Sequence, residues 1–81
     1  MTKKEYENCE KLMEEAIRNM ESSNEYWDEY EKAKKENKSA NAEVAMRKFD
    51  YYRGHADGIY DTLVMIGFRH ERMKELCELS K

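Results

Sequence analysis

The sequence predicts an all-α protein built as an antiparallel hairpin of two long amphipathic helices. Apolar residues recur at alternating spacings of three and four over most of the 81-residue chain, which is the heptad pattern of packed helices. The chain has no proline and three glycines, and 41% of its residues are charged, a composition typical of long helices with a solvated face. One polar stretch near the middle separates two apolar series, so a short turn should join two antiparallel helices.

The first helix is expected over about residues 2–36. Thr2 followed three residues later by Glu5 is a capping-box pattern, in which each side chain satisfies a free group of the other residue at a helix start. The apolar seam of this helix runs through Tyr6, Cys9, Met13, Ala16, Met20, Ser23, Trp27 and Tyr30. The opposite face carries no apolar residue and is therefore expected to face water.

A turn is expected at residues 37–41, because Asn and Ser side chains favour turns and helix caps. The second helix is expected over about residues 42–79. Its seam again alternates spacings of three and four: Ala42, Ala45, Phe49, Tyr52, Ala56, Ile59, Leu63, Ile66, His70, Met73 and Cys77. Gly67 is a candidate kink, but the seam stays in phase across it, and the sequence therefore favours one continuous helix.

The short turn also predicts the register of the two helices. Facing residues should have numbers that sum to about 76, which places Trp27 opposite Phe49. The same register puts Cys9 about ten residues from Cys77, or ~15 Å along the helix axis, which is too far for a disulfide within one hairpin. Free thiols are therefore expected.

The second helix has a further stripe of residues spaced three and four apart, which is largely apolar or small: Val44, Arg47, Tyr51, Gly54, Gly58, Asp61, Met65, Phe68 and Arg72. A helix that is apolar nearly all round is buried all round, and one partner helix cannot achieve this. Short chains also commonly gain stability by association. The sequence therefore predicts that a homodimer or larger oligomer completes a helical bundle.

The predicted interface residues are Tyr51, Gly54, Gly58, Asp61, Met65 and Phe68. The two glycines lie one turn apart and would let another backbone approach closely, with the aromatic residues and the methionine as anchors. Asp61 would meet an arginine or a tyrosine across the interface. The alternative is that the glycines are tolerated helix defects that cost ~1 kcal/mol each relative to alanine.

Candidate chemistry on the second helix is sparse. His55, Asp57 and Asp61 could hold a divalent ion, but the Glu-x-x-His pair of helical-bundle metal sites is missing, so no metal or other cofactor is predicted. No set of catalytic groups converges, and the chain is not expected to be an enzyme. Tyr51, Arg53, His55 and Arg69 are candidates for binding a nucleotide-like ligand at an oligomer seam.

The charge balance limits the classes of partner. The net charge of −3 is modest and both signs are interspersed, which argues against nucleic acid as a partner. No apolar run approaches the ~20 residues of a membrane span, and the first residues lack the apolar stretch of a secretory signal. The expected location is the cytoplasm, without membrane attachment.

The segment Gly-x-x-Asp-Gly-Ile-x-Asp-x-Leu at residues 54–63, the short length and the richness in Lys, Glu, Asn and Tyr resemble small accessory proteins of phages and prophages. Many such proteins with a known role block a host defence system, either by binding a host protein or by sequestering a nucleotide signal in a helical oligomer. The resemblance implies this class of role and no site residues.

The leading hypothesis is therefore a non-enzymatic, homo-oligomeric helical protein that binds another protein, in the manner of a phage-type inhibitor of host defence. The alternatives are a protein that sequesters a nucleotide-like ligand at the oligomer seam and a purely structural coiled-coil component.

Overall fold

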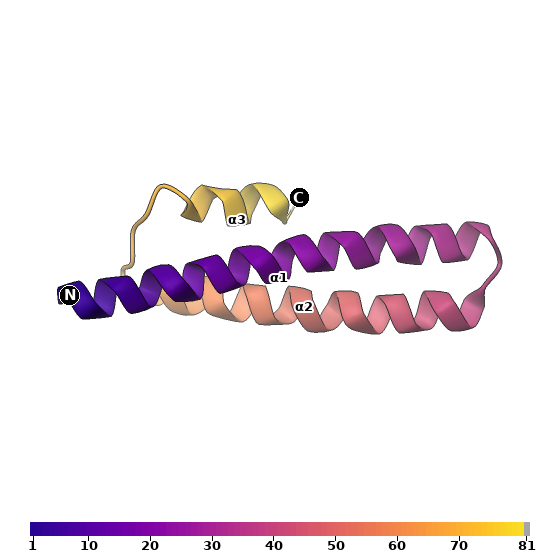
Figure 1. Ribbon diagram of the computed structural model, residues 1–81, viewed down its shortest axis with the longest axis horizontal. Helices are drawn as coiled ribbons and strands as arrows, with labels where there is room; N and C mark the ends of the chain where they lie inside the picture. Colours follow the sequence, from indigo (N-terminus) through magenta and orange to yellow (C-terminus); the bar gives the residue numbers. More distant parts are fainter. Residues whose placement is uncertain (81) are drawn as a thin grey trace.

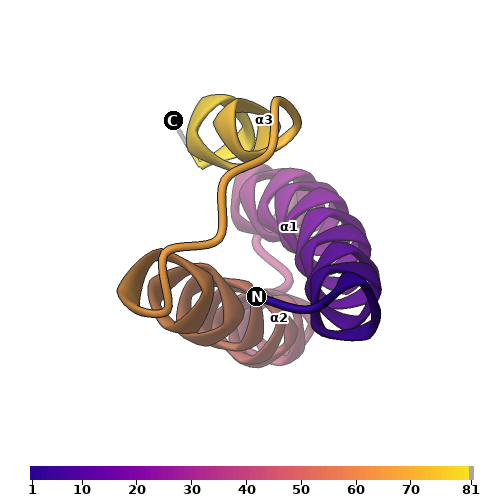
Figure 2. The same ribbon diagram turned by 90° about the vertical axis from the view of Figure 1, so that its left-hand side faces the viewer.

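Two long antiparallel helices and one short helix make up residues 1–80, the part of the chain that the computed structural model describes (Figure 1). Helix α1 spans Lys3–Lys35, α2 spans Ser39–Met65 and α3 spans Met73–Leu79, with no strand among the described residues. The three helices form an elongated molecule with Cα extents of 52 × 17 × 16 Å. Figure 2 shows α3 lying against the hairpin on the α1 side. The predicted all-helical hairpin is thus confirmed, and a third helix is added to it.

Local hydrogen bonds explain where α1 begins and ends. The side chain of Thr2 accepts a hydrogen bond from the backbone N–H of Glu5 at 3.1 Å and caps the helix, as the sequence predicted. At the other end, Asn37 adopts a φ of 58°, and the N–H of Lys38 donates to the carbonyl of Ala33 at 2.9 Å. This is a Schellman ending, in which one left-handed residue stops the helix and reverses the chain. Because α2 already begins at Ser39, the turn is shorter than predicted.

The core follows the predicted seams over most of the hairpin. The seam residues buried in α1 and α2 are Cys9, Met13, Ala16, Met20, Ser23, Ala42, Ala45, Ala56 and Leu63. The rings of Trp27 and Phe49 lie 5.2 Å apart between centroids, which confirms the predicted register at this pair. Ser23 is polar, but its hydroxyl donates to the carbonyl of Met20 at 2.7 Å, so its burial leaves no hydrogen-bond group unsatisfied.

The prediction of one continuous helix over residues 42–79 is wrong, because α2 ends at Met65. Gly67 adopts a left-handed φ of 78°, and the N–H of Phe68 donates to the carbonyl of Leu63 at 3.0 Å. Glycine takes this conformation without the steric penalty of a side chain. The chain therefore reverses at Gly67, and Ile66, which the sequence placed in the seam, is 54% exposed.

The reversal is favoured by what it buries. Phe68 and Leu76 are 4% and 2% exposed, and both join the core cluster of the hairpin, next to residues such as Met13 and Leu63. Burying side chains of this size contributes roughly 1.5–3 kcal/mol each. In a continuous helix, Phe68 would lie on the outer stripe of the helix, away from the seam, and Leu76 would lie beyond the start of α1 at Lys3. The reversal thus buries Phe68, one member of the outer stripe, within the same chain and leaves the earlier members of that stripe exposed.

Polar contacts fix the position of α3 on the hairpin. Asn24 donates from Nδ2 to the carbonyl of Leu79 at 3.0 Å. His70 Nε2 lies 3.2 Å from a carboxylate oxygen of Glu10. The backbone N–H of Arg72 donates to Nδ1 of the same ring at 3.1 Å, so the ring proton sits on Nε2 and is donated to Glu10. The histidine thereby links the connection between α2 and α3 to α1.

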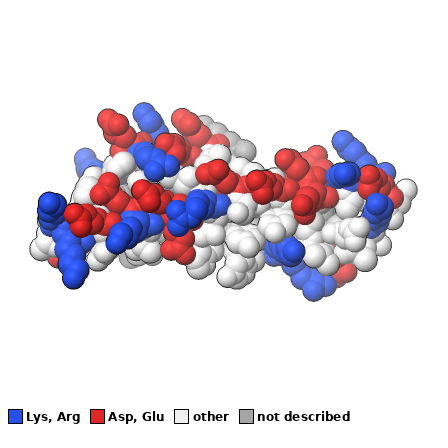
Figure 3. All heavy atoms as spheres, viewed as in Figure 1, with Lys and Arg blue, Asp and Glu red and all other residues white. Residues whose placement is uncertain are grey.

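Charged side chains of both signs are interspersed along the face of the molecule seen in Figure 3, with uncharged surface between them. This face carries no large patch of one sign of the kind that binds nucleic acid through its phosphates.

Candidate binding surface

One side of α2 remains uncovered by the rest of the chain. We call it the outer face of α2 and define it by Val44, Tyr51, Gly54, Gly58, Asp61 and Met65, all of which are exposed. Tyr51 is 66% exposed and Met65 is 86% exposed. Helix α3 contacts α2 through Arg53 and Tyr60, which lie roughly 160–180° around the helix from Tyr51 at about 100° per residue. Helix α3 therefore covers the opposite side of α2.

A shallow groove runs beside the two glycines of the outer face. It has a volume of about 390 Å³ and is lined by Leu12 from α1 and by Gly54, His55, Gly58, Ile59 and Thr62 from α2. A Cβ atom built on Gly54 or Gly58 would have no neighbouring heavy atom within 4 Å. The glycines are therefore not needed for packing inside this chain, and they leave room for the backbone of something else.

Aromatic contacts hold the ring of Tyr51 in place on this surface. It stacks on the His55 ring at 6.1 Å between centroids and meets the Tyr52 ring edge-on at 5.2 Å. His55 Nε2 in turn lies 3.4 Å from a carboxylate oxygen of Glu15 on α1. A side chain that is already ordered loses less conformational entropy when a partner binds, so Tyr51 is suited to act as an anchor.

The structure places five of the six predicted interface residues on the exposed surface and corrects the sixth. Phe68 is buried, with its ring 5.2 Å from that of Tyr6 and 5.9 Å from that of His70. The prediction that Phe68 is an exposed anchor is wrong because the reversal at Gly67 turns this side chain into the core. Asp61 is exposed and lies on the edge of the outer face.

Sequence reasoning missed the contribution of α1 to this surface. Leu12 is exposed and lines the groove, although it lies outside the heptad seam of α1. The available signal was a leucine directly beside the seam residue Met13, where a solvated face would carry a polar residue.

The four candidate ligand residues do not converge within one chain. Tyr51 and His55 stack on the outer face. Arg53 points to the side covered by α3, where it donates to the carbonyl of Ser80 at 2.9 Å. Arg69 lies in the connection between α2 and α3, beside a hollow that Tyr6 also lines. One chain therefore forms no pocket from all four residues.

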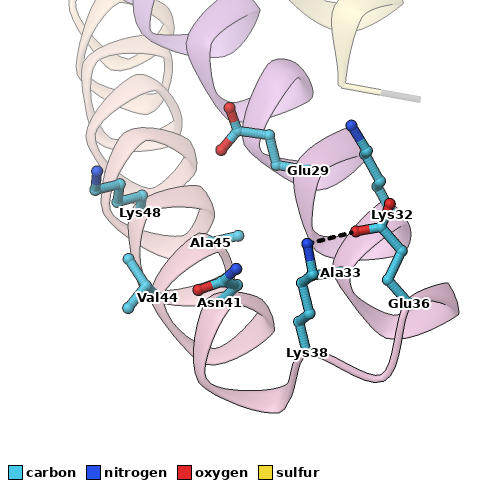
Figure 4. Close-up of a pocket in the computed structure, with 9 residues that line it drawn as sticks. All are labelled: Glu29, Lys32, Ala33, Glu36, Lys38, Asn41, Val44, Ala45 and Lys48. Carbon is cyan, nitrogen blue, oxygen red and sulfur yellow. Dashed lines mark ion pairs between the residues drawn. The ribbon is translucent and has the colours of Figure 1, made fainter.

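A second hollow lies next to the hairpin turn (Figure 4). Its volume is about 420 Å³, and it is lined by Glu29, Lys32, Ala33, Glu36, Lys38, Asn41, Val44, Ala45 and Lys48. Lys38 Nζ and a carboxylate oxygen of Glu36 form an ion pair of 3.2 Å in it. Its lining carries three lysines and two glutamates, and this net charge of +1 is too small to select one kind of ionic ligand.

Metal-binding and nucleophilic groups are few. Among residues 1–80, no three His, Cys, Asp or Glu side chains come together in a way that could hold a metal ion. Asp57, a candidate ligand, forms an ion pair with Arg53 at 3.5 Å. Cys9 is buried and Cys77 is exposed, and both thiols are free. The hydrogen bond between Cys77 Sγ and the Tyr60 hydroxyl, 3.2 Å long, is the main cause that raises the pKa of Tyr60.

No protein-family model matches this chain, and neither a curated protein nor a solved structure matches it. Within residues 1–80, no helix combines the length and the apolar character that a membrane span requires.

Proposed function

We propose that this protein is a non-enzymatic helical binding protein that associates with itself and binds a partner protein through the outer face of α2. The observation that carries the proposal is the exposure of Tyr51 and Met65 on either side of a groove that no residue of the chain fills. Large apolar side chains exposed around a hollow are typical of protein-binding surfaces.

The outer face suits a helical partner. Gly54 and Gly58 lie one turn apart, and neither is approached by other parts of the chain, so a helix backbone could lie close to α2 at this point. Tyr51 would supply an ordered aromatic anchor above the glycines, and the flexible side chain of Met65 would adapt to the partner below them. A second copy of α2, related by a two-fold axis near the glycines, would present its own tyrosine, glycines and methionine to the first copy.

The biological role that we propose is the one implied by the phage-type accessory proteins that the sequence resembles, namely inhibition of a host defence protein. In this role the outer face would occupy a surface that the host protein needs. No catalytic group is required, because binding alone would block the target.

Self-association provides the direct test. Gly58→Leu fills the groove and Tyr51→Asp places a charge at the anchor, and each should weaken self-association at least tenfold in sedimentation equilibrium. Both positions are exposed, so circular dichroism should show unchanged helix content. Asp28→Leu is the control, since it adds a leucine to an exposed position on the solvated face of α1, away from the groove. If both variants associated as the wild type does, the outer face would not be the binding surface.

A second candidate function is sequestration of a nucleotide-like ligand at the seam between copies. It is favoured by the parallel rings of Tyr51 and His55, on which a base could stack, and by the ammonium group of Lys48, 5.3 Å from the centroid of the nearby Tyr26 ring. A nucleotide that binds in this way should raise the melting temperature with concentration, and His55→Ala should abolish the shift. A protein-binding role predicts no such shift.

A further inference from the structure

The segment that carries α3 is attached to the hairpin through two buried side chains and a few polar contacts. We call residues 68–80 the α3 arm. Phe68 and Leu76 join it to the apolar core of the hairpin, at a surface that we call the groove, and its main polar contacts also reach the hairpin, such as the bonds of Asn24 to the Leu79 carbonyl and of Arg53 to the Ser80 carbonyl. Because the arm and the groove belong to the same sequence, the groove of any other copy fits this arm equally well.

The link between the arm and the hairpin is one glycine. At Gly67 the φ of 78° reverses the chain, and a Cβ atom there would meet no heavy atom within 4 Å. Gly67 can therefore change from the left-handed to the helical conformation without a clash between its own atoms and neighbouring side chains.

The backbone hydrogen bonds at the hinge can be kept when the chain straightens. In the folded-back chain, the N–H of Phe68 donates to the carbonyl of Leu63, and the N–H of Gly67 donates to that of Val64. In a continuous helix each N–H donates to the carbonyl four residues earlier. The N–H of Gly67 would then donate to Leu63 and the N–H of Phe68 to Val64, so the two donors swap their acceptors. No hydrogen bond between them is lost.

The sequence around the hinge also suits a straight helix. The apolar seam of α2 continues in phase through Ile66 and Met73, which is a pattern that favours a continuous helix. The folded-back chain leaves Val64, Met65 and Ile66 exposed in a row directly before the hinge.

We propose that two copies exchange their α3 arms. In the exchanged dimer, residues 66–72 of each chain become helical and join α2 and α3 into one helix, and α3 docks in the groove of the other copy through Leu76, Leu79 and Ser80, as it does here within one chain. The two straightened helices would pass each other at Gly67, close to the two-fold axis. Val64 and Met65 of one copy would then be covered by the same residues of the other, which gives the dimer an interface that the closed chain lacks.

Substitution of the hinge tests the exchange. Alanine disfavours the left-handed conformation of the closed chain and favours the helix of the exchanged chain, in both copies of the dimer. Gly67→Ala should therefore lower the dissociation constant of the dimer at least a hundredfold in sedimentation equilibrium. Gly67→Asn is the matched control, because asparagine tolerates the left-handed conformation, as Asn37 does at the end of α1. It should associate much less than Gly67→Ala.

Two further variants separate exchange from association through the outer face of α2. In the Gly67→Ala chain, Leu76→Asp removes the anchor of the arm and should abolish the added dimer, whereas Tyr51→Asp should leave it intact. Mixing tagged Gly67→Ala/Leu76→Asp chains, whose grooves are unchanged, with Gly67→Ala chains should recover mixed dimers, which guards against a simple folding defect.

Two results would overturn the exchange. One is a Gly67→Ala chain that associates no more strongly than the wild type. The other is a Gly67→Ala dimer that survives Leu76→Asp but is lost with Tyr51→Asp. The second result would leave the proposed function standing, since it would assign the dimer to the outer face.

Discussion

Replacing Leu76 by alanine should release α3 from the hairpin while α1 and α2 stay folded. The leucine side chain is 2% exposed, and the substitution removes three carbon atoms. At ~0.8 kcal/mol per buried methylene, the lost transfer free energy is about 2.4 kcal/mol, and the remaining cavity adds to it. We expect a total of about 3 kcal/mol, near the lower end for Leu→Ala, because a short surface helix can settle into part of the cavity.

A loss of about 3 kcal/mol is large compared with the free energy that keeps α3 docked on the hairpin. A chain of 81 residues has a total unfolding free energy of roughly 4–12 kcal/mol, and most of its buried side chains belong to the α1–α2 seam. The amides of α3 should therefore lose protection against hydrogen exchange about a hundredfold, while those of Met13 and its neighbours in the seam keep theirs. Two-dimensional NMR of the wild type and the variant measures both sets in one experiment.

Two other leucines serve as controls. Leu63 is fully buried between α1 and α2, so Leu63→Ala should cost a similar free energy but lower protection in all three helices. Leu12 is largely exposed, so Leu12→Ala should cost less than ~1 kcal/mol. Unchanged exchange rates in α3 of Leu76→Ala, or a uniform loss in all helices, would refute the reasoning that α3 is a locally docked unit.

Three further results are expected. Asn37→Ala should lower the unfolding free energy by about 1 kcal/mol in urea titration, because alanine is disfavoured at a φ of 58°, whereas Asn37→Gly should not lower it. Met65→Glu should change the unfolding free energy of the monomer, measured at low protein concentration, by less than ~0.5 kcal/mol, because this side chain is exposed within one chain. The pKa of Tyr60 is raised in the folded protein, first by its hydrogen bond to Cys77 and then by the charge of Cys77, so the unfolded chain loses this proton first. Tyr60 therefore makes its full contribution to the free energy of unfolding below about pH 10, and this contribution is lost as the pH rises further. Tyr60→Phe should flatten this part of a plot of melting temperature against pH.

The elements that sequence reasoning predicted well are those determined by local and periodic signals. Thr2 and Glu5 marked the start of α1, and the alternating spacing identified the buried face of each helix down to Leu63. The contact between Trp27 and Phe49 followed from the short turn alone, because a tight connection leaves little choice of register.

The candidate site was predicted in part, for the same reason. The outer face of α2 follows from helix periodicity, and Tyr51, Gly54, Gly58, Asp61 and Met65 are exposed on it. The proposed ligand set failed to converge within one chain because Arg53 and Tyr51 are separated by about 160° around the helix at 100° per residue. The ligand site was predicted at a seam between copies, and it stays a prediction.

The path of the chain after Ile66 shows what the sequence by itself left open. The seam continues in phase through His70 and Cys77, so a straight helix satisfies the periodic pattern. Gly67 is also an ideal residue for ending a helix in the left-handed conformation, so a reversal satisfies the local pattern. The sequence by itself therefore determined that residues 1–65 form a helical hairpin with its buried and solvated faces. Only the tertiary structure decided that the chain turns back at Gly67, because the gain comes from burying Phe68 and Leu76 in a groove that exists once α1 and α2 are packed.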